Sequence, residues 1–321
     1  CDISGAWDNA IDMVAVQYGH VVRSKIHRAG DWCMYLKGGS AYFWVMNNEF
    51  FDCGTGGFTA GQGTGFEFMT PPWLHYETYD VKFVRNLIRN TAGAAWGVNG
   101  GYNILIAYNT AYNVGTRSHV VEVTFGSRSC DGDVITCQRH RTLGGWGAIS
   151  TAYESAVPIP SRNTYIHNNL IVNIPPVKSQ WQHFEIPGPR PAIPGSNVPS
   201  PETVDENLRI AGNIIFNGGG EMPLGLGEST GCRPTNPTCN AAQLVSANRI
   251  NTLLPQFVNA AAFDFRLVRS SPLCMSITTY ASAVIPNFPG NDRPAFPKSP
   301  SWILENNGVR TVGPIGAFGC A

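Results

Sequence analysis

Five polar residues stand at matching positions in successive segments of this sequence, and their side chains are suited to chemistry. Lys37, Asn99 and Glu122 each follow a polar corner residue by 13 positions, and Gln62 follows one by 14 positions. The fifth residue, Gln17, belongs to an earlier segment of the same kind. A lysine amine can remove a proton, a glutamate can exchange one, and amides can hold hydroxyl groups. Stacked on parallel strands about 4.8 Å apart, the five would form a polar column roughly 19 Å long, enough to face several sugar units.

Within this column, Lys37 is the candidate base and Glu122 the second candidate catalytic residue. Hydrolysis by paired aspartates on neighbouring coils is not predicted, because Asp12, Asp31 and Asp52 fall at different offsets. Glu122 beside Asn99 offers only two oxygen ligands, whereas calcium takes six or more. We therefore predict no metal and no cofactor, with calcium as a weak candidate.

Two flanking regions add candidate substrate-binding residues. Trp73 and His75 lie in a long insertion, GTGFEFMTPPWLHYETY, and aromatic rings stack on sugar rings. Arg117 and His119 precede the apolar segment VVEV. The alternative is that the column is merely a solvated face, that the aromatic residues hold the loops down, and that His119 is a hydrogen-bonded corner residue. The sequence leaves both interpretations open.

The elements that must position these residues are short apolar segments that end on asparagine. The corner asparagines are Asn48, Asn86, Asn109, Asn169 and Asn213, with Ser24 as a weaker sixth. Alternation of apolar and polar residues is typical of half-buried strands, and a repeat near 23 residues with insertions is typical of a solenoid. We predict an all-β, right-handed parallel β-helix over residues 1–230, with loops inserted at about 63–78, 126–161 and 186–204. Residues 231–321 are predicted to form C-terminal coils and an irregular, Pro-rich capping tail.

The cysteines and the composition narrow the function classes. Two pairs lie seven residues apart and suit small disulfide loops, Cys130 with Cys137 and Cys232 with Cys239; Cys274 with Cys320 is a third pair, Cys33 with Cys53 stays open, and Cys1 is left over. Disulfides favour an extracellular or cell-surface location. The net charge is zero and only 14% of residues are charged, which argues against a nucleic-acid partner. No apolar run approaches 18 residues, so no membrane span is predicted.

The runs WCMYLKGGSAYFWVMNNEFFDCGTGGFTAGQGTGFEF (32–68) and GVNGGYNILIAYNTAYNVGTRSHVVEV (97–123), with the ending GPIGAFG, resemble the extracellular right-handed parallel β-helix repeat family of the pectin and alginate lyase-like superfamily. The resemblance implies a secreted protein with a polysaccharide partner. In the alginate lyase and chondroitinase B members, a lysine base and an arginine acid lie on adjacent coils. Lys37 matches the lysine, whereas Gln62 occupies the place of the arginine.

Two functions follow as expectations. The first is a secreted carbohydrate-active or glycan-binding protein for an acidic polysaccharide, in the form of a degenerate lyase or epimerase. The second is a non-catalytic structural subunit of an extracellular fibre or cell-surface assembly, O-glycosylated on its Pro/Ser-rich loop. In that second case the chain would self-associate through its N-terminal coil, because AIDMVAVQYG (10–19) begins a strand with no capping helix before it.

Overall fold

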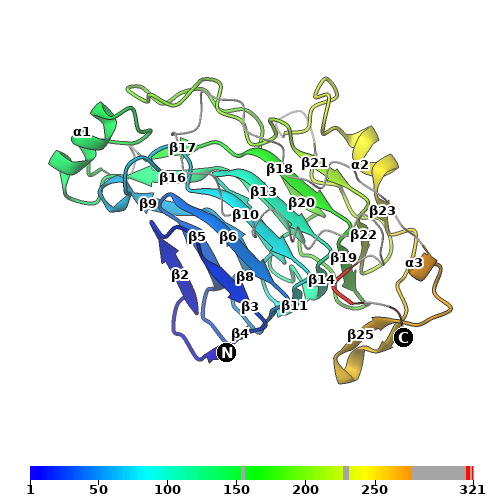
Figure 1. Ribbon diagram of the computed structural model, residues 1–321. Coiled ribbons are helices and arrows are strands. Elements are labelled where there is room, and N and C mark those ends of the chain that lie inside the picture. Colours follow the sequence, from blue (N-terminus) through cyan, green and yellow to red (C-terminus); the bar gives the residue numbers. More distant parts are fainter. Residues whose placement is uncertain (153–155, 227–230, 276–315, 319, 321) are drawn as a thin grey trace.

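The computed structural model describes residues 1–152, 156–226, 231–275, 316–318 and 320 (Figure 1). In this part of the chain, three long sheets pair their strands in parallel throughout. Sheet A contains β1 (Asp2–Ser4), β4 (Lys25–His27), β7 (Glu49–Phe51), β11 (Leu87–Thr91), β14 (Thr110–Val114), β19 (Leu170–Asn173), β22 (Ile214–Asn217) and β23 (Arg249–Ile250).

The other two long sheets have six strands each. Sheet B contains β2 (Ile11–Val14), β5 (Trp32–Lys37), β8 (Gly56–Ala60), β12 (Trp96–Asn99), β15 (Val121–Thr124) and β20 (Phe184–Glu185). Sheet C contains β3 (His20–Val22), β6 (Ser40–Met46), β10 (Thr78–Val84), β13 (Gly101–Ala107), β18 (Arg162–His167) and β21 (Arg209–Ala211).

The chain visits the sheets in a fixed cyclic order, B then C then A, and each new coil lies beside the previous one. The sequence colours of Figure 1 accordingly pass in order across the molecule, from blue at β2 to yellow-green at β22 and yellow at β23. The protein is therefore all-β, with stacked parallel sheets that are consistent with a parallel β-helix-like fold.

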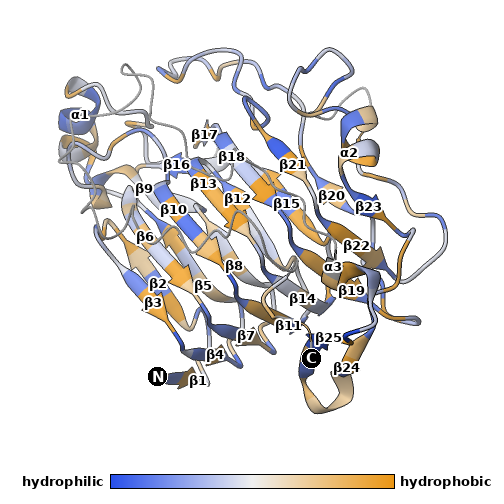
Figure 2. Ribbon diagram, turned by 45° about the vertical axis from the view of Figure 1, so that its right-hand side comes forward, coloured by the Kyte–Doolittle hydropathy of each residue, from blue (hydrophilic) through white to orange (hydrophobic). Residues whose placement is uncertain are grey.

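The core lies inside the coil, because strand residues of all three sheets alternate between inward and outward positions. One inward row of sheet B joins Met34, Phe58 and Trp96, all fully buried. Phe58 stacks on Phe83 of sheet C at 4.3 Å between ring centroids. Apolar residues accordingly fall on the strands in Figure 2. Each coil is therefore stabilised by the apolar side chains that it buries against its neighbours.

The corner from sheet C to sheet A carries a ladder of buried asparagines. The Nδ2 of each asparagine donates to the Oδ1 of the next one, at 2.9 to 3.1 Å, through Asn48, Asn86, Asn109, Asn169, Asn213 and Asn248. The backbone N–H of Ser24 donates to Asn48 Oδ1 and begins the ladder. The residue before several of these asparagines has a positive φ, as at Asn47 and Tyr108, and the chain turns there within two residues.

A second, shorter asparagine ladder lies at the corner from sheet A to sheet B, and the sequence pattern did not reveal it. The Nδ2 of Asn173 donates to Asn217 Oδ1 at 2.8 Å, and the backbone N–H of Asn217 donates to Asn251 Oδ1 at 2.8 Å. Each asparagine satisfies backbone groups that the turn leaves unpaired.

The long insertions all leave the coil at the corner from sheet B to sheet C. They occupy residues 61–77, 125–161 and 186–208. The first two form a small sheet of β9 (Gly63–Gly65), β16 (Gly126–Ser129) and β17 (Val157–Ile159). In the first insertion, the short 3-10 helix η1 (Phe66–Phe68) directly follows β9. The second insertion contains the helix α1 (Val134–Thr142). Together they build a second layer over the beginning of sheet C.

Four disulfides fasten the fold. They join Cys33 with Cys53, Cys130 with Cys137, Cys232 with Cys239 and Cys274 with Cys320. The two pairs predicted from their seven-residue spacing form, as does the pair predicted for the C-terminal tail, and Cys33 with Cys53, which the sequence left open, is the fourth. Cys1 has no disulfide partner and is exposed.

The described C-terminal region is less regular than the coils. It contains α2 (Ala241–Ala247), the antiparallel pair β24 (Phe257–Asn259) and β25 (Asp264–Leu267), η3 (Ala260–Ala262) and α3 (Pro272–Met275). Residues 316–318 and Cys320 lie against sheet A, where the backbone N–H of Gly316 donates to Asn168 O. The Pro-rich tail predicted to cap the coils falls mostly on residues 276–315, outside the described residues.

Candidate functional site

The outward face of sheet B carries two parallel rows of side chains. The first row passes through Asp12, Tyr35, Thr59, Gly97, Glu122 and Glu185, one residue from each of six neighbouring strands. Five spacings of about 4.8 Å make this row roughly 24 Å long. The second row begins with Val14 and Lys37 and ends with Asn99 and Thr124.

The predicted column is not a single row in this register. Lys37 and Asn99 belong to the second row, whereas Glu122 lies opposite Gly97 in the first. Gln62 lies one residue beyond Gly61, whose N–H donates to Leu36 O, so Gly61 rather than Gln62 takes the place beside Lys37. Gln17 bridges Ala41 at the start of sheet C. Counting from the asparagine corner failed because the corners from sheet A to sheet B differ in length.

Lys37 lies among neutral partners at one end of sheet B. Its Nζ donates to Gln62 Oε1 at 3.4 Å and lies 4.6 Å from the centre of the Tyr35 ring. The Tyr35 hydroxyl donates to Asp12 Oδ2 at 2.6 Å, and burial raises the pKa of Tyr35. Three strand spacings, about 14 Å, separate β5 from β15, so Lys37 and Glu122 cannot act on the same atom.

At the other end of sheet B, two carboxylates flank one histidine. Glu122 and Glu185 lie opposite each other on β15 and β20. His119 Nε2 lies 3.1 Å from Glu185 Oε2, and its Nδ1 lies 3.8 Å from Glu122 Oε1. Ser118 donates to Glu122 Oε1 at 2.6 Å. The histidine side chain is 7% exposed, whereas the carboxylate side chains are 17% and 37% exposed, so a ligand can reach both glutamates.

An exposed aromatic ring adjoins this cluster. Trp181 is 53% exposed, and its ring centre lies 5.1 Å from that of His119. Arg117 is exposed in the turn that also holds His119, before β15, and its Nη2 donates to Gly54 O. A half-exposed indole beside polar groups is the kind of surface that stacks on a sugar ring.

A pocket of about 340 Å³ opens beside Glu185. Its lining includes Thr124 and Ser127 from the sheet edge and Arg190 from the third insertion. The Arg190 guanidinium lies 4.6 Å from the centre of the Phe125 ring, which holds the cation at the pocket wall. The pocket therefore brings the Arg190 guanidinium close to Glu185, one member of the glutamate pair.

Sequence reasoning missed Glu185, Trp181 and Arg190. The ten-residue corner before β20 shifts Glu185 three positions beyond Gln182, the residue that regular counting selects. A usable signal was the shared pattern of histidine, apolar residues and glutamate in HVVE (119–122) and HFE (183–185). Arg190 lies within a Pro-rich loop and carries no pattern of its own.

The aromatic residues of the first insertion cover sheet C and do not line the face of sheet B. Trp73 is 6% exposed and packs edge-on against Tyr42 and Tyr79. His75 Nε2 lies 3.0 Å from Gly144 O, and its ring lies 4.7 Å from Trp146. The alternative interpretation, in which these side chains hold the loops down, therefore describes both residues, because the second insertion closes over them.

A buried ion pair locks the first two insertions together. Arg128 and Glu77 are both fully buried, and the guanidinium Nε donates to Glu77 Oε1 at 2.9 Å. Arg128 also donates to the carbonyl oxygens of Leu74 and Trp146. Glu77 accepts two further bonds, from the Thr64 hydroxyl at 2.6 Å and the Gly38 N–H at 3.2 Å. Every charged atom is thus paired, as burial requires.

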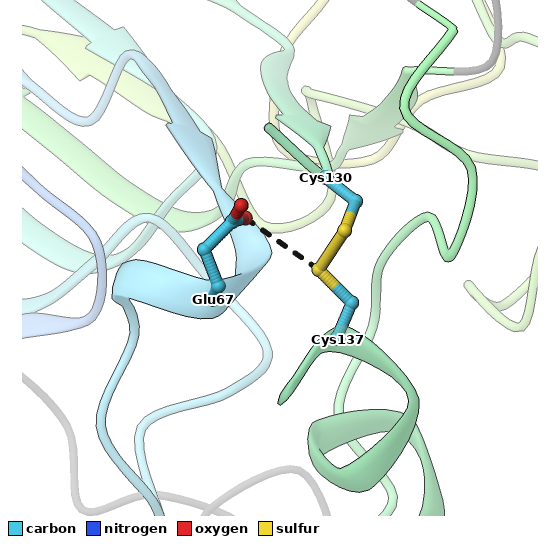
Figure 3. Close-up of side chains that lie close together, drawn as sticks. All are labelled: Glu67, Cys130 and Cys137. Atoms are coloured by element: carbon cyan, nitrogen blue, oxygen red, sulfur yellow. Dashed lines mark hydrogen bonds between the residues drawn. A yellow bond between two sulfur atoms is a disulfide. The ribbon is translucent and has the colours of Figure 1, made fainter. Parts of the chain in front are cut away.

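One group of metal-ligand atoms lies within coordination distance among the described residues: Glu67, Cys130 and Cys137. Figure 3 shows the Glu67 carboxylate pointing from η1 toward the disulfide, with Oε2 at 3.5 Å from Cys137 Sγ. The two sulfurs are bonded to each other, so neither is a thiolate ligand. Glu67 Oε1 instead accepts from the N–H groups of Asp131 and Asp133, which fixes the disulfide loop.

In the part of the chain that the structure describes, no helix has the length and apolar character needed to cross a membrane. Neither a protein-family model, nor a curated protein, nor a solved structure matches this chain. The assignment of function therefore rests on the geometry of sheet B.

Proposed function

We propose that this protein is a secreted right-handed parallel β-helix protein of the pectin and alginate lyase-like superfamily, and that it binds an acidic polysaccharide along sheet B. The cyclic order of the sheets and the asparagine ladder support the fold assignment. The four disulfides support an extracellular location. The observation that carries the function is the pair Glu122 and Glu185, in register on adjacent strands beside a pocket with Arg190.

Each part of the site has a role toward a glycan. The Trp181 ring offers a stacking surface, and Arg190 offers a bidentate partner for a uronate carboxylate. Lys37, Gln62 and Asn99 provide hydrogen-bond donors and acceptors farther along the face. These contacts would hold an extended chain across the strands, so that consecutive sugars meet consecutive coils.

The reaction that the site supports best is hydrolysis of a glycosidic bond. Two carboxylates on facing positions can serve as acid and base, or as acid and nucleophile, for an oxocarbenium-like transition state. His119 contacts both of them and can exchange a proton with either. Elimination with Lys37 as base is less well supported, because Lys37 faces Gln62 and lies about 14 Å from Glu122.

Incubation with polygalacturonate, alginate and chondroitin, with a neutral glucan alongside, tests this function. New reducing ends without an unsaturated product are expected for at least one polyuronate. Glu185→Gln and Glu122→Gln should each lower the rate by about 100-fold or more, since acid–base groups contribute factors of that order. Glu206→Gln is the matched control, because Glu206 is exposed and pairs with Arg162 away from sheet B.

If the wild type forms unsaturated products and Lys37→Ala does not, the reaction is elimination and not hydrolysis. If the protein binds a polymer without turnover, and its affinity is unchanged in both glutamate variants, the site is a glycan-binding surface without catalytic activity. No binding to any of the polymers would contradict the proposed function.

A second candidate is a structural subunit that binds its own copies through the first coil. Trp7 is 94% exposed there, Tyr18 and Val22 are also exposed, and Cys1 carries a free thiol. An exposed apolar patch of this kind favours protein contacts. Concentration-dependent sedimentation that is abolished by Trp7→Ser would support assembly, and a monomer at all concentrations would contradict it.

A further inference from the structure

Glu202 is the one carboxylate, among the described residues, whose two oxygens are both buried and without a hydrogen-bond partner. The whole residue is inaccessible to solvent. Burial of an unpaired charge is costly, so such a group takes up a proton or draws a cation toward it. Consistent with this, burial raises the pKa of Glu202 to about 7, while the positive charge of Arg190 acts in the opposite direction.

Glu202 is joined directly to the pocket beside sheet B. It lies in the third insertion, and residues 187–204 of that insertion are called the strap here. The backbone N–H of Arg190 donates to Glu202 O at 2.9 Å, and the N–H of Glu202 donates to Arg190 O at 3.0 Å. The two residues therefore form an antiparallel bridge across the strap. Their side chains form no ion pair within the described structure, and the Arg190 guanidinium rests on Phe125 at the pocket wall.

The strap is anchored on both sides of this bridge. Val204 packs in the main core, and Val198 packs among the aromatic residues that cover sheet C. Asn197 Nδ2 donates to Gly145 O at 2.7 Å, and Arg141 donates to Gly195 O. With both ends held, the adjustable parts of the bridge are its two side chains.

We infer that Glu202 is a positioning residue that sets the availability of Arg190 to an anionic ligand. When Glu202 is neutral, Arg190 remains at the pocket wall and can pair with a ligand carboxylate. When Glu202 is ionised, its uncompensated charge competes for the same guanidinium and withdraws it from the pocket. The identity of the ligand, a uronate-containing glycan, rests on the proposed function, whereas the coupling of Glu202 to Arg190 does not.

The direction of the pH dependence follows from the raised pKa. A carboxyl group whose pKa is higher in the folded protein than in the unfolded chain stabilises the fold fully at low pH, and that stabilisation is lost as pH rises through about 7. Other titratable groups near the bridge are Glu185 and His119 across the pocket, and Asp205, which accepts from Cys232 N–H. Glu185 and His119 are unchanged in every variant below, so their effect on the pH dependence of binding is the same in all of them.

Isothermal titration with an oligogalacturonide and with a neutral oligosaccharide of equal length, at about pH 5.5 and about pH 8, tests the inference. For the wild type, the dissociation constant of the uronide should rise at least tenfold between the two pH values, since each pH unit above the pKa can shift the equilibrium tenfold. The neutral ligand should show no such change. Glu202→Gln should keep the low-pH affinity at both values, and Glu206→Gln should retain the wild-type profile.

Thermal unfolding of the same variants is independent of any ligand. Glu202→Gln should raise the midpoint at pH 8 and leave it unchanged near pH 5, because only the ionised form is unfavourable. Equal midpoints for the wild type and Glu202→Gln at both pH values would overturn the inference. A midpoint difference at pH 8 with no uronide binding at any pH would overturn the proposed ligand alone. A uronide affinity that falls with pH as steeply in Glu202→Gln as in the wild type would show that Glu202 does not control Arg190.

Discussion

Asn109 illustrates how one side chain serves three coils at once. Its Oδ1 accepts from the backbone N–H of Asn86 at 2.8 Å and from Asn86 Nδ2 at 3.1 Å. Its own Nδ2 donates to Phe83 O and to Asn169 Oδ1. The amide is fully buried, so water cannot replace any of these partners. At this scale the stacked coils are held together by buried ladder amides such as that of Asn109, whose donors and acceptor are all used.

Asn109→Ala should lower the free energy of unfolding by about 3 kcal/mol or more, because each buried group left without a partner costs about 1 to 3 kcal/mol. Urea denaturation followed by tryptophan fluorescence measures the change. Asn113→Gly is the control, since Asn113 makes only an exposed contact of 3.5 Å and its positive φ suits glycine. A loss below about 1 kcal/mol in Asn109→Ala would contradict the importance of the ladder.

His183 accepts a hydrogen bond at the second asparagine ladder. Asn217 Nδ2 lies 3.3 Å from His183 Nδ1, and Asn217 Oδ1 accepts from Asn173 Nδ2 and from Ser179 N–H. The amide nitrogen of Asn217 therefore faces the ring, and Nδ1 accepts. The proton of the neutral ring consequently sits on Nε2.

Burial lowers the pKa of His183 to about 4. A histidine with a lowered pKa stabilises the fold above its ordinary value near 6.5, and that stabilisation is lost as pH falls toward 4. His183 should therefore make the free energy of unfolding fall by up to about 1.4 kcal/mol per pH unit in this window. Unfolding of His183→Gln should show a shallower pH slope than the wild type, whereas His20→Gln, at an exposed position, should not.

At the scale of elements, the first two insertions depend on each other as well as on the coil beneath them. The strand β16 of the second insertion pairs with β9 of the first, and the Arg128–Glu77 pair joins the same two segments. The aromatic residues between them, including Trp73 and Trp146, form a separate apolar cluster. Loss of one contact should therefore loosen both insertions.

Arg128→Met should destabilise the protein by about 3 to 5 kcal/mol, because it leaves the Glu77 carboxylate buried without its charge partner. Limited proteolysis should then cut within residues 61–77 and 125–152 before the coils. Arg139→Met, on the exposed side of α1, should be near neutral. Unchanged proteolysis in Arg128→Met would show that the insertions are held independently.

The sequence predicted those elements whose signal is local. The asparagine corners could be found because each follows its own apolar strand by the same two-residue turn, as at Asn86 and Asn109. The outward rows of sheet B could not, because the corner before each strand varies from four residues before β12 to ten before β20. The burial of Trp73 could not be predicted either, because it depends on Trp146 and Tyr79 from other parts of the chain.

At the scale of the whole molecule, the proposed function would use the outward face of sheet B as a binding surface for an extended ligand. The outward row from Asp12 to Glu185 measures roughly 24 Å, with Lys37 near one end and the glutamate pair at the other. Tyr35 is 3% exposed and Thr59 is inaccessible, so a polymer along this face would contact Lys37 and Asn99 of the second row there. Its affinity would depend on how much of the face it covers.

Affinity for uronic acid oligosaccharides should therefore increase with chain length and level off once the ligand covers the row. Titration with a series of defined lengths measures this dependence. Lys37→Ala should weaken the longer oligosaccharides by several-fold and leave the shortest ones unaffected, because only long ligands reach from the pocket to β5. Equal affinity for the shortest and longest members would restrict binding to the pocket beside Glu185.

The three corners of the coil differ in what they tolerate. Among the described residues, each corner that leads from a strand of sheet C to a strand of sheet A has two residues, whereas the corner from sheet B to sheet C holds from one residue, at Gly100, to the 37 residues 125–161. Variation in length is thus greatest at the corner from sheet B to sheet C, and it is smaller at the corner from sheet A to sheet B, which has four to ten residues. New loops could therefore be exchanged or grafted at the corner from sheet B to sheet C while the asparagine ladder at the other corner keeps the coils in register.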